Sequence, residues 1–251
     1  MTNFFSFCFF LISILISNSS NLIPGFDYEK IHITRYGKNI EIDIFKLNPD
    51  SIDVDIINVS EKKTLKEVLA NSEQENQYFL ICNAGMFNTD YKTNMGYMKS
   101  DGSILNNRDH PNYYSVLAFD PLFIDLPSFY IYDTDIVPLD SILKSYNSVV
   151  ENLRLIKRSR ENRWPEQEKR WTELAIGQDS DNNIIIIYCH NDLSMFEFNN
   201  LILSLPIDLS TAQHLEGNSP AQLYFSFKNH TIDLDNGVFV PNLLGFKMRK
   251  F

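Results

Sequence analysis

Alternation of polar and apolar residues is the feature that most constrains how this chain can fold. Three early segments alternate in this way: residues 30–36 (KIHITRY), 39–47 (NIEIDIFKL) and 51–59 (SIDVDIINV). A period of two places every second side chain on the same face of an extended strand, so these segments predict half-buried strands. The continuous apolar run at residues 78–83 (YFLICN) predicts a central strand buried on both faces.

Helices are expected at few positions. Thr64-x-x-Glu67 and Ser194-x-x-Glu197 have the capping-box pattern, and the second opens an apolar 3.6-residue spacing that ends before Pro206. Many short strands with few helices predict an α+β fold over residues 21–251: a single domain with one twisted, mixed β-sheet and a few helices packed on its faces.

Composition and charge exclude several classes of partner. The chain has 251 residues, of which 44% are apolar, which suits one domain with a sizeable core. Its net charge of −10 argues against nucleic acid or an anionic membrane as the main partner.

The first twenty residues carry no charge and contain an apolar run from Phe4 to Ile16. This pattern predicts a signal peptide over residues 1–20 and a secreted or periplasmic protein without stable membrane insertion after cleavage. An uncleaved anchor is the competing interpretation. Cys82 and Cys189 each end an apolar run, and we expect buried free thiols there more than a disulfide.

Two strands, within residues 79–91 and 212–225, are interrupted in the same way. Asn83 is followed by Ala84-Gly85, and Glu216 is followed by Gly217-Asn218-Ser219. Glycine beside a polar residue at a strand end lets the backbone approach a ligand closely. We therefore expect both interruptions to meet at one site. The alternative is two tight turns whose polar side chains bind only local backbone groups.

An ordered set of motifs carries a resemblance to a known family. The set comprises Asn83-Ala84-Gly85-Met86-Phe87, Gly96, Asp101-Gly102, Glu173-Leu174-Ala175-Ile176-Gly177, a helix over 194–205, and Leu215-Glu216-Gly217-Asn218-Ser219. Over about residues 58–225, this order resembles the phosphodiester glycosidase family, and most closely its short bacterial secreted branch. Members of the family include the enzyme that uncovers mannose 6-phosphate by removing N-acetylglucosamine. The chain departs from the family pattern at Ala84 (usually Gly), Glu173 (often Arg) and Glu216 (usually Asp).

The resemblance implies a secreted hydrolase that cleaves a sugar from a phosphodiester-linked glycan or envelope polymer, without a cofactor or a metal ion. The leaving group would then be a phosphate monoester with a pKa of about 6, far below the value of about 15.7 for water. Such a group departs with little protonation, so one carboxylate suffices as nucleophile or as base. Glu216 is the candidate for this role.

Other residues are expected to complete the site. Asn83 and His214 are further catalytic candidates, because Asn83 offers hydrogen bonds to the substrate and His214 stands two residues before Glu216 on a strand. The residues predicted to bind substrate or phosphate are Gly85, Arg154, His190, Gly217, Asn218 and Ser219.

Two rival functions remain open from the sequence. The first is a catalytically silent carbohydrate-binding or exopolysaccharide-assembly protein on the same fold, which the departures at Ala84 and Glu173 favour. The second is a metal-dependent phosphodiesterase, whose ligands would be His190, Asp192, His214 and Glu216.

Overall fold

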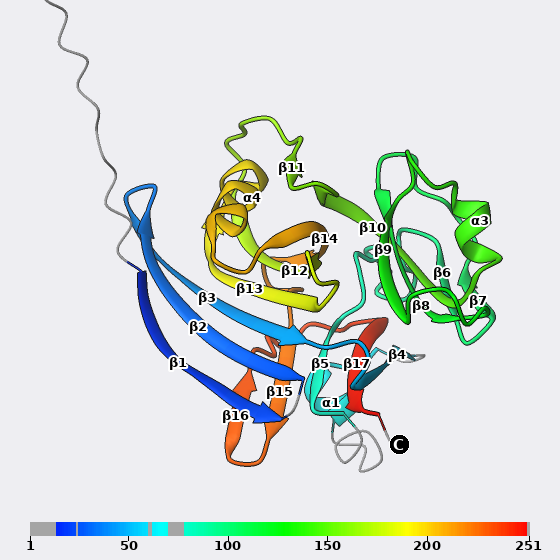
Figure 1. Cartoon of the computed structure of the whole chain (residues 1–251), viewed down its shortest axis with the longest axis horizontal. Coiled ribbons are helices and arrows are strands. Elements are labelled where there is room, and N and C mark those ends of the chain that lie inside the picture. The colour runs from blue at the N-terminus through cyan, green and yellow to red at the C-terminus, as the bar shows by residue number, and fades with distance from the viewer. Residues whose placement is uncertain (1–13, 24, 60–61, 70–77, 250–251) are drawn as a thin grey trace, which may run out of the picture.

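The computed structural model describes residues 14–23, 25–59, 62–69 and 78–249 (Figure 1). Among these residues, the strands form two sheets, and neighbouring strands are antiparallel. The first sheet contains, in spatial order, β1 (Ile14–Ile23), β2 (Phe26–Arg35), β3 (Lys38–Leu47), β13 (Ile184–Leu193), β12 (Trp171–Asp179), β14 (Leu209–Gly217), β10 (Tyr146–Lys157), β6 (Met98–Ser100) and β7 (Ser103–Asn106). Branching from it are β11 (Glu161–Asn162), β8 (Tyr114–Pro121) and β9 (Phe129–Asp133).

The second sheet is smaller. Its strands are, in order, β16 (His230–Asp233), β15 (Leu223–Phe227), β5 (Leu80–Asn83), β17 (Asn242–Met248) and β4 (Ile52–Asn58). The described helices are α1 (Leu65–Leu69), α3 (Leu139–Leu143) and α4 (Met195–Ser204). The predicted α+β class is confirmed, and the structure refines it: the strands divide into two antiparallel sheets, where the sequence suggested one mixed sheet.

Each face of the first sheet has its own core. Between the two sheets lies one buried cluster, which includes Leu174, Leu215 and Phe225. On the other face, α4 covers a second cluster that includes Ala175 and Phe198 (Figure 1). Successive strand residues such as Leu174 and Ala175 thus point into different cores, as the period of two requires. This alternation assigns polar side chains of the sheet to one face or the other.

The two cysteines of the described chain are free and buried, one in each core. Cys82 lies between the sheets and Cys189 lies under α4, so the expectation of separate thiols is confirmed. Burial raises the pKa of the Cys189 thiol to about 12. Neither thiol is therefore a reactive nucleophile at neutral pH.

Residues 1–13 of the predicted signal peptide lie outside the described residues. Residues 14–20 fall within β1, which pairs with β2. Cleavage of residues 1–20 stays a prediction. Among the described residues, no helix is long and apolar enough to cross a membrane.

The cap of α4 gives a first test of the fold. The Ser194 hydroxyl accepts a hydrogen bond from the Glu197 N–H at 3.2 Å, and the Glu197 carboxylate accepts one from the Ser194 N–H at 3.0 Å. We expect Ser194→Ala to lower the free energy of unfolding by about 1 kcal/mol, because the Glu197 N–H loses its side-chain acceptor. Urea denaturation followed by circular dichroism measures this, and an unchanged midpoint would contradict it.

Candidate active site

The candidate site lies where β10 and β14 separate. The two strands pair only around Arg154–Gln213 and Ile156–Ala212. Earlier residues of β10 pair with β6 and β8 instead, whereas the end of β14 keeps its pairing with β12. The loop that follows β5 reaches this fork, since the Phe87 backbone hydrogen-bonds the Glu216 carboxylate. The structure therefore brings the two interrupted strands together, as their sequence pattern predicted.

A β-bulge re-aims the end of β14 at this point. Glu216 lies opposite Leu174, while His214 lies opposite Ala175, so Leu215 is an extra residue in the pairing. Bulges of this kind bend a strand and recur beside active sites. The bulge also breaks the simple alternation that placed His214 and Glu216 on one face. Their charges nevertheless act on each other.

Glu216 is a buried carboxyl with an altered pKa. Glu216 is only 9% exposed, and burial raises the pKa of its carboxyl to about 7. The positive charge of His214 and hydrogen bonds from the Gly217 and Phe87 backbones partly offset this effect, while the charge of Glu173 adds to it. Near neutral pH, both the protonated and the ionised forms are therefore populated, which suits an acid or base in catalysis.

His214 is bonded to a partner that the sequence did not suggest. Its Nδ1 binds Oε1 of Glu173, and Oε2 of Glu173 accepts a hydrogen bond from the Trp171 indole at 2.7 Å. Burial lowers the pKa of His214, but the Glu173 and Glu216 carboxylates outweigh burial and the net shift is upward. The sequence interpretation treated Glu173 only as the loss of a cation, whereas in the structure its carboxyl is bonded to the His214 imidazole.

Two buried amides support the loop after β5. Asn83 Oδ1 accepts the Gln222 N–H at 2.7 Å, and Asn152 Nδ2 donates to the Ala84 carbonyl at 2.9 Å. The first bond joins the two interrupted strands directly, because Gln222 follows the Glu216 motif. Asn83 Nδ2 and Asn152 Oδ1 are buried without a protein partner. Such atoms call for a water molecule or a polar ligand.

Glu151 and Tyr113 are site residues that the sequence interpretation missed. Glu151 is 2% exposed, and its Oε2 accepts N–H groups of Tyr97 at 2.8 Å and His110 at 3.0 Å. Burial and the charges of Glu151 and Glu216 raise the pKa of the Tyr113 phenol, so Tyr113 is near both carboxyls. One signal existed: Glu151 is an acid inside the strand-like run VVENLRLI.

A substitution at Glu151 tests its ionisation. Burial, followed by contact with the Asp109 carboxyl, raises the pKa of Glu151 to about 7, against the N–H bonds that lower it. A raised carboxyl pKa stabilises the fold fully below the unfolded value of about 4.5, and this contribution is lost as pH rises through 7. We expect Glu151→Gln to raise the free energy of unfolding by on the order of 1–2 kcal/mol at pH 8 and to change it little at pH 5. Equal destabilisation at both values would contradict this.

The predicted phosphate-binding residues are placed differently from one another. Gly217 and Asn218 lie beside Glu216, but their N–H groups already have acceptors. The Gly217 N–H donates to Glu216 Oε2 at 3.3 Å, and the Asn218 N–H donates to the Thr172 carbonyl at 3.2 Å. Ser219 is exposed in the same turn. Arg154 binds two carboxylates, Asp133 at 3.1 Å and Asp135 at 2.8 Å, with which a phosphate would have to compete.

Gly85 lies at the closest approach of the β5 loop to β10. A β-carbon at this position would lie 2.1 Å from Oδ1 of Asn152. The loop can therefore lie against Asn152 only because residue 85 has no side chain. The sequence interpretation selected Gly85 for backbone contact with a ligand; here the close contact is with the protein itself.

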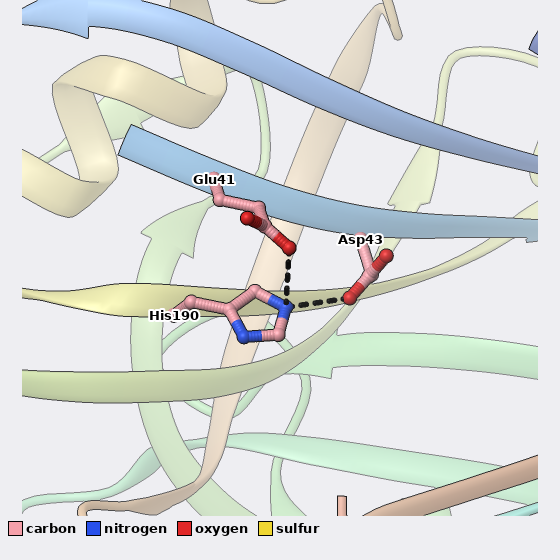
Figure 2. Close-up of side chains that lie close together, drawn as sticks. All are labelled: Glu41, Asp43 and His190. Carbon is pink, nitrogen blue, oxygen red and sulfur yellow. Dashed lines mark hydrogen bonds and ion pairs between the residues drawn. The ribbon is translucent and has the colours of Figure 1, made fainter. Parts of the chain in front are cut away.

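His190 belongs to a different cluster, which Figure 2 shows. Its Nε2 lies 2.6 Å from Asp43 Oδ2 and 3.7 Å from Glu41 Oε1. Asp43 alternates with residues of the α4-side core and therefore lies on the inter-sheet face, whereas His214 and Glu173 lie on the α4 side. The four-residue metal arrangement suggested by the sequence is therefore not assembled.

The cluster in Figure 2 contains side chains that can ligate a metal ion. Glu41, Asp43 and His190 each offer one ligand atom, and these atoms lie within 4.8 Å of one another. Lys30 already lies against both carboxylates, 2.5 Å from Glu41 and 3.5 Å from Asp43. The Tyr28 hydroxyl donates to Asp43 at 2.6 Å. These contacts satisfy the cluster as a network of ion pairs on three neighbouring strands.

Comparison with known proteins identifies the class. The phosphodiester glycosidase family model matches residues 76–247, so the chain belongs to this family. No curated protein matches the sequence. A hypothetical protein from Synechocystis has a similar structure, with a TM-score of 0.68 and 12% identity over 95% of this chain and 68% of that one. The catalytic domain of zebrafish N-acetylglucosamine-1-phosphodiester alpha-N-acetylglucosaminidase, auto-inhibited by its pro-peptide, gives a TM-score of 0.66 and 12% identity over 95% and 88% of the two chains. At such identities, the two structures establish a shared fold.

Proposed function

We propose that this protein is a glycosidase that releases a sugar from a phosphodiester-linked glycan or envelope polymer, with Glu216 as its reactive carboxylate. The observation that carries the proposal is the position of Glu216: it is buried, it lies where the two interrupted strands meet, and the Phe87 and Gly217 backbones hold it. Membership of the phosphodiester glycosidase family supports the reaction class.

The chemistry needs only one carboxylate if the leaving group is a phosphate monoester. The pKa of such a group is about 6, so it leaves without strong acid assistance. Ionised Glu216 then attacks the anomeric carbon, or removes a proton from water that does so. Because the pKa of Glu216 is raised to about 7, we expect turnover to increase with pH through that range.

The surroundings of Glu216 suggest how a sugar is held. The buried Asn83 Nδ2 and Asn152 Oδ1 have no protein partner, and they offer one donor and one acceptor for hydroxyl groups. A hollow of about 770 Å³ lies beyond the loop that follows β5, lined by Asn88, Asp90, Thr93 and residues 104–108. A polymeric substrate has room to continue there.

The place of action is part of the proposal. The uncharged, apolar N-terminal segment supports secretion or a periplasmic location, and a net charge of −10 argues against nucleic acid as a partner. N-terminal sequencing of the protein recovered from its native cells tests this. A start near residue 21 is the expected result, and recovery only with residue 1 intact would contradict it.

The function is tested with a panel of sugar 1-phosphodiesters that vary in sugar and aglycone. We expect the protein to release free sugar and phosphate monoester from at least one member. Binding of saccharides without turnover of any member would favour the silent carbohydrate-binding protein instead. Turnover abolished by a chelator would favour the metal-dependent alternative.

A further inference from the structure

Glu173 is a buried charge for which the single-carboxylate mechanism has no role. It lies on β12 opposite Gly217, and the residue is 1% exposed. Both carboxylate oxygens are bonded, one to His214 Nδ1 and the other to the Trp171 indole N–H at 2.7 Å. A carboxylate held at both oxygens has one orientation, and it imposes one orientation on the His214 ring.

This contact determines what His214 can offer a ligand. With Nδ1 bonded to Glu173, Nε2 is the nitrogen left for any other partner. The charged groups that act on the ring are Glu173 from β12 and Glu216 from β14. Tyr113, from the segment before β8, is in turn acted on by the charges of Glu216 and of Glu151 on β10. Both nearby carboxylates favour the protonated imidazole, in agreement with the upward direction of its pKa.

We propose that Glu173 is a positioning residue that holds His214 as an imidazolium, and that this imidazolium recognises an anionic group attached to the sugar, such as a phosphodiester oxygen. The inference rests on the proposed function and assigns recognition of the phosphodiester group to His214. The His214 imidazolium also provides a cation for the anion. The guanidinium of Arg154 is less suited to this role, since it is bonded to Asp133 and Asp135.

The protonation of His214 is measured directly by NMR titration of the imidazole nitrogens. The chain has five histidines, and His214→Gln and His190→Gln assign the signals of these two residues. We expect His214 to remain protonated at neutral pH with its proton on Nδ1 directed to Glu173. In Glu173→Gln, its pKa should fall by about one unit or more.

A matched control lies on the opposite face of the same sheet. His190 is bonded to Asp43 as His214 is to Glu173 (Figure 2). Asp43→Asn, which removes the carboxylate bonded to His190, should leave the titration of His214 unchanged. Glu173→Asp and Trp171→Phe keep the charge, so they should preserve a protonated His214 even if Glu173→Gln folds poorly.

Anion recognition is measured with inorganic phosphate as the probe, by calorimetry at pH 6 and pH 8. We expect binding to weaken from pH 6 to pH 8 in the wild type, and Glu173→Gln to weaken it about tenfold at pH 6, the equivalent of one pKa unit. Glu173→Asp should retain binding.

A neutral His214 across this range, or phosphate binding unchanged by Glu173→Gln, would overturn the proposal. These readouts need no turnover, so absence of hydrolysis on the panel would count against the proposed function alone. Hydrolysis by a protein whose His214 is neutral would count against the role of Glu173 alone.

Discussion

Glu216→Gln should abolish turnover of the active panel member while leaving the fold intact. The amide has nearly the same shape and can still accept the Phe87 and Gly217 N–H groups, but it is neither a nucleophile nor a base. We expect kcat to fall by at least about 100-fold, the lower range for loss of an acid–base group. The matched control is Glu161→Gln on β11, which removes an exposed carboxylate that pairs with Arg163. Turnover equal to the wild type would show that the site assignment is wrong.

The same variant should be more stable than the wild type in alkaline solution. The folded-state pKa of Glu216 is raised to about 7 from an ordinary 4.5, so ionising this carboxyl works against folding as pH rises through 7. Glutamine has no charge to bury. Thermal unfolding at pH 8 should therefore give a higher Tm for Glu216→Gln than for the wild type, with little difference at pH 5. A protein that is inactive yet more stable separates a catalytic role from a structural one.

The sequence predicted those parts of the fold that depend on local pattern. The period of two in residues 39–47 gave β3, and the capping box at Ser194 gave α4, because both signals arise between near neighbours. The division into two sheets depends on which distant strands pair, such as β5 with β15 and β17. Alternation within one strand carries no information on its partner strands, so the pattern could not predict the division into two sheets.

The site shows the same limit. Asn83 and Glu216 were recognisable because each interrupts an apolar strand beside a glycine. Glu173 was not recognised as a partner of His214, because the two residues are 41 positions apart and only the β12–β14 pairing brings them into contact. Leu215 shifts that pairing by one residue, and no single-strand pattern reveals such a bulge. Residues that act in pairs across strands therefore required the structure.

Gly85→Ala should destabilise the protein through one identifiable contact. The new methyl group would lie 2.1 Å from Oδ1 of Asn152, a side chain that is fully buried and tied to the Ala84 carbonyl through its Nδ2. The backbone at Gly85 is not left-handed, so the clash and not backbone strain sets the cost. We expect the free energy of unfolding to fall by about 1–3 kcal/mol, as for overpacking elsewhere. Urea denaturation measures the change.

A double-mutant cycle shows whether Asn152 is the cause. Asn152→Ala alone removes the donor to the Ala84 carbonyl and should cost about 1–3 kcal/mol. In the double variant Gly85→Ala/Asn152→Ala, the clash is gone, so the total loss should be smaller than the sum of the single losses by about 0.5–3 kcal/mol. Strict additivity would mean that the loop accommodates the methyl group elsewhere. Because this loop also carries the Phe87 N–H to Glu216, turnover in the single Gly85→Ala variant should fall even at temperatures where it is fully folded.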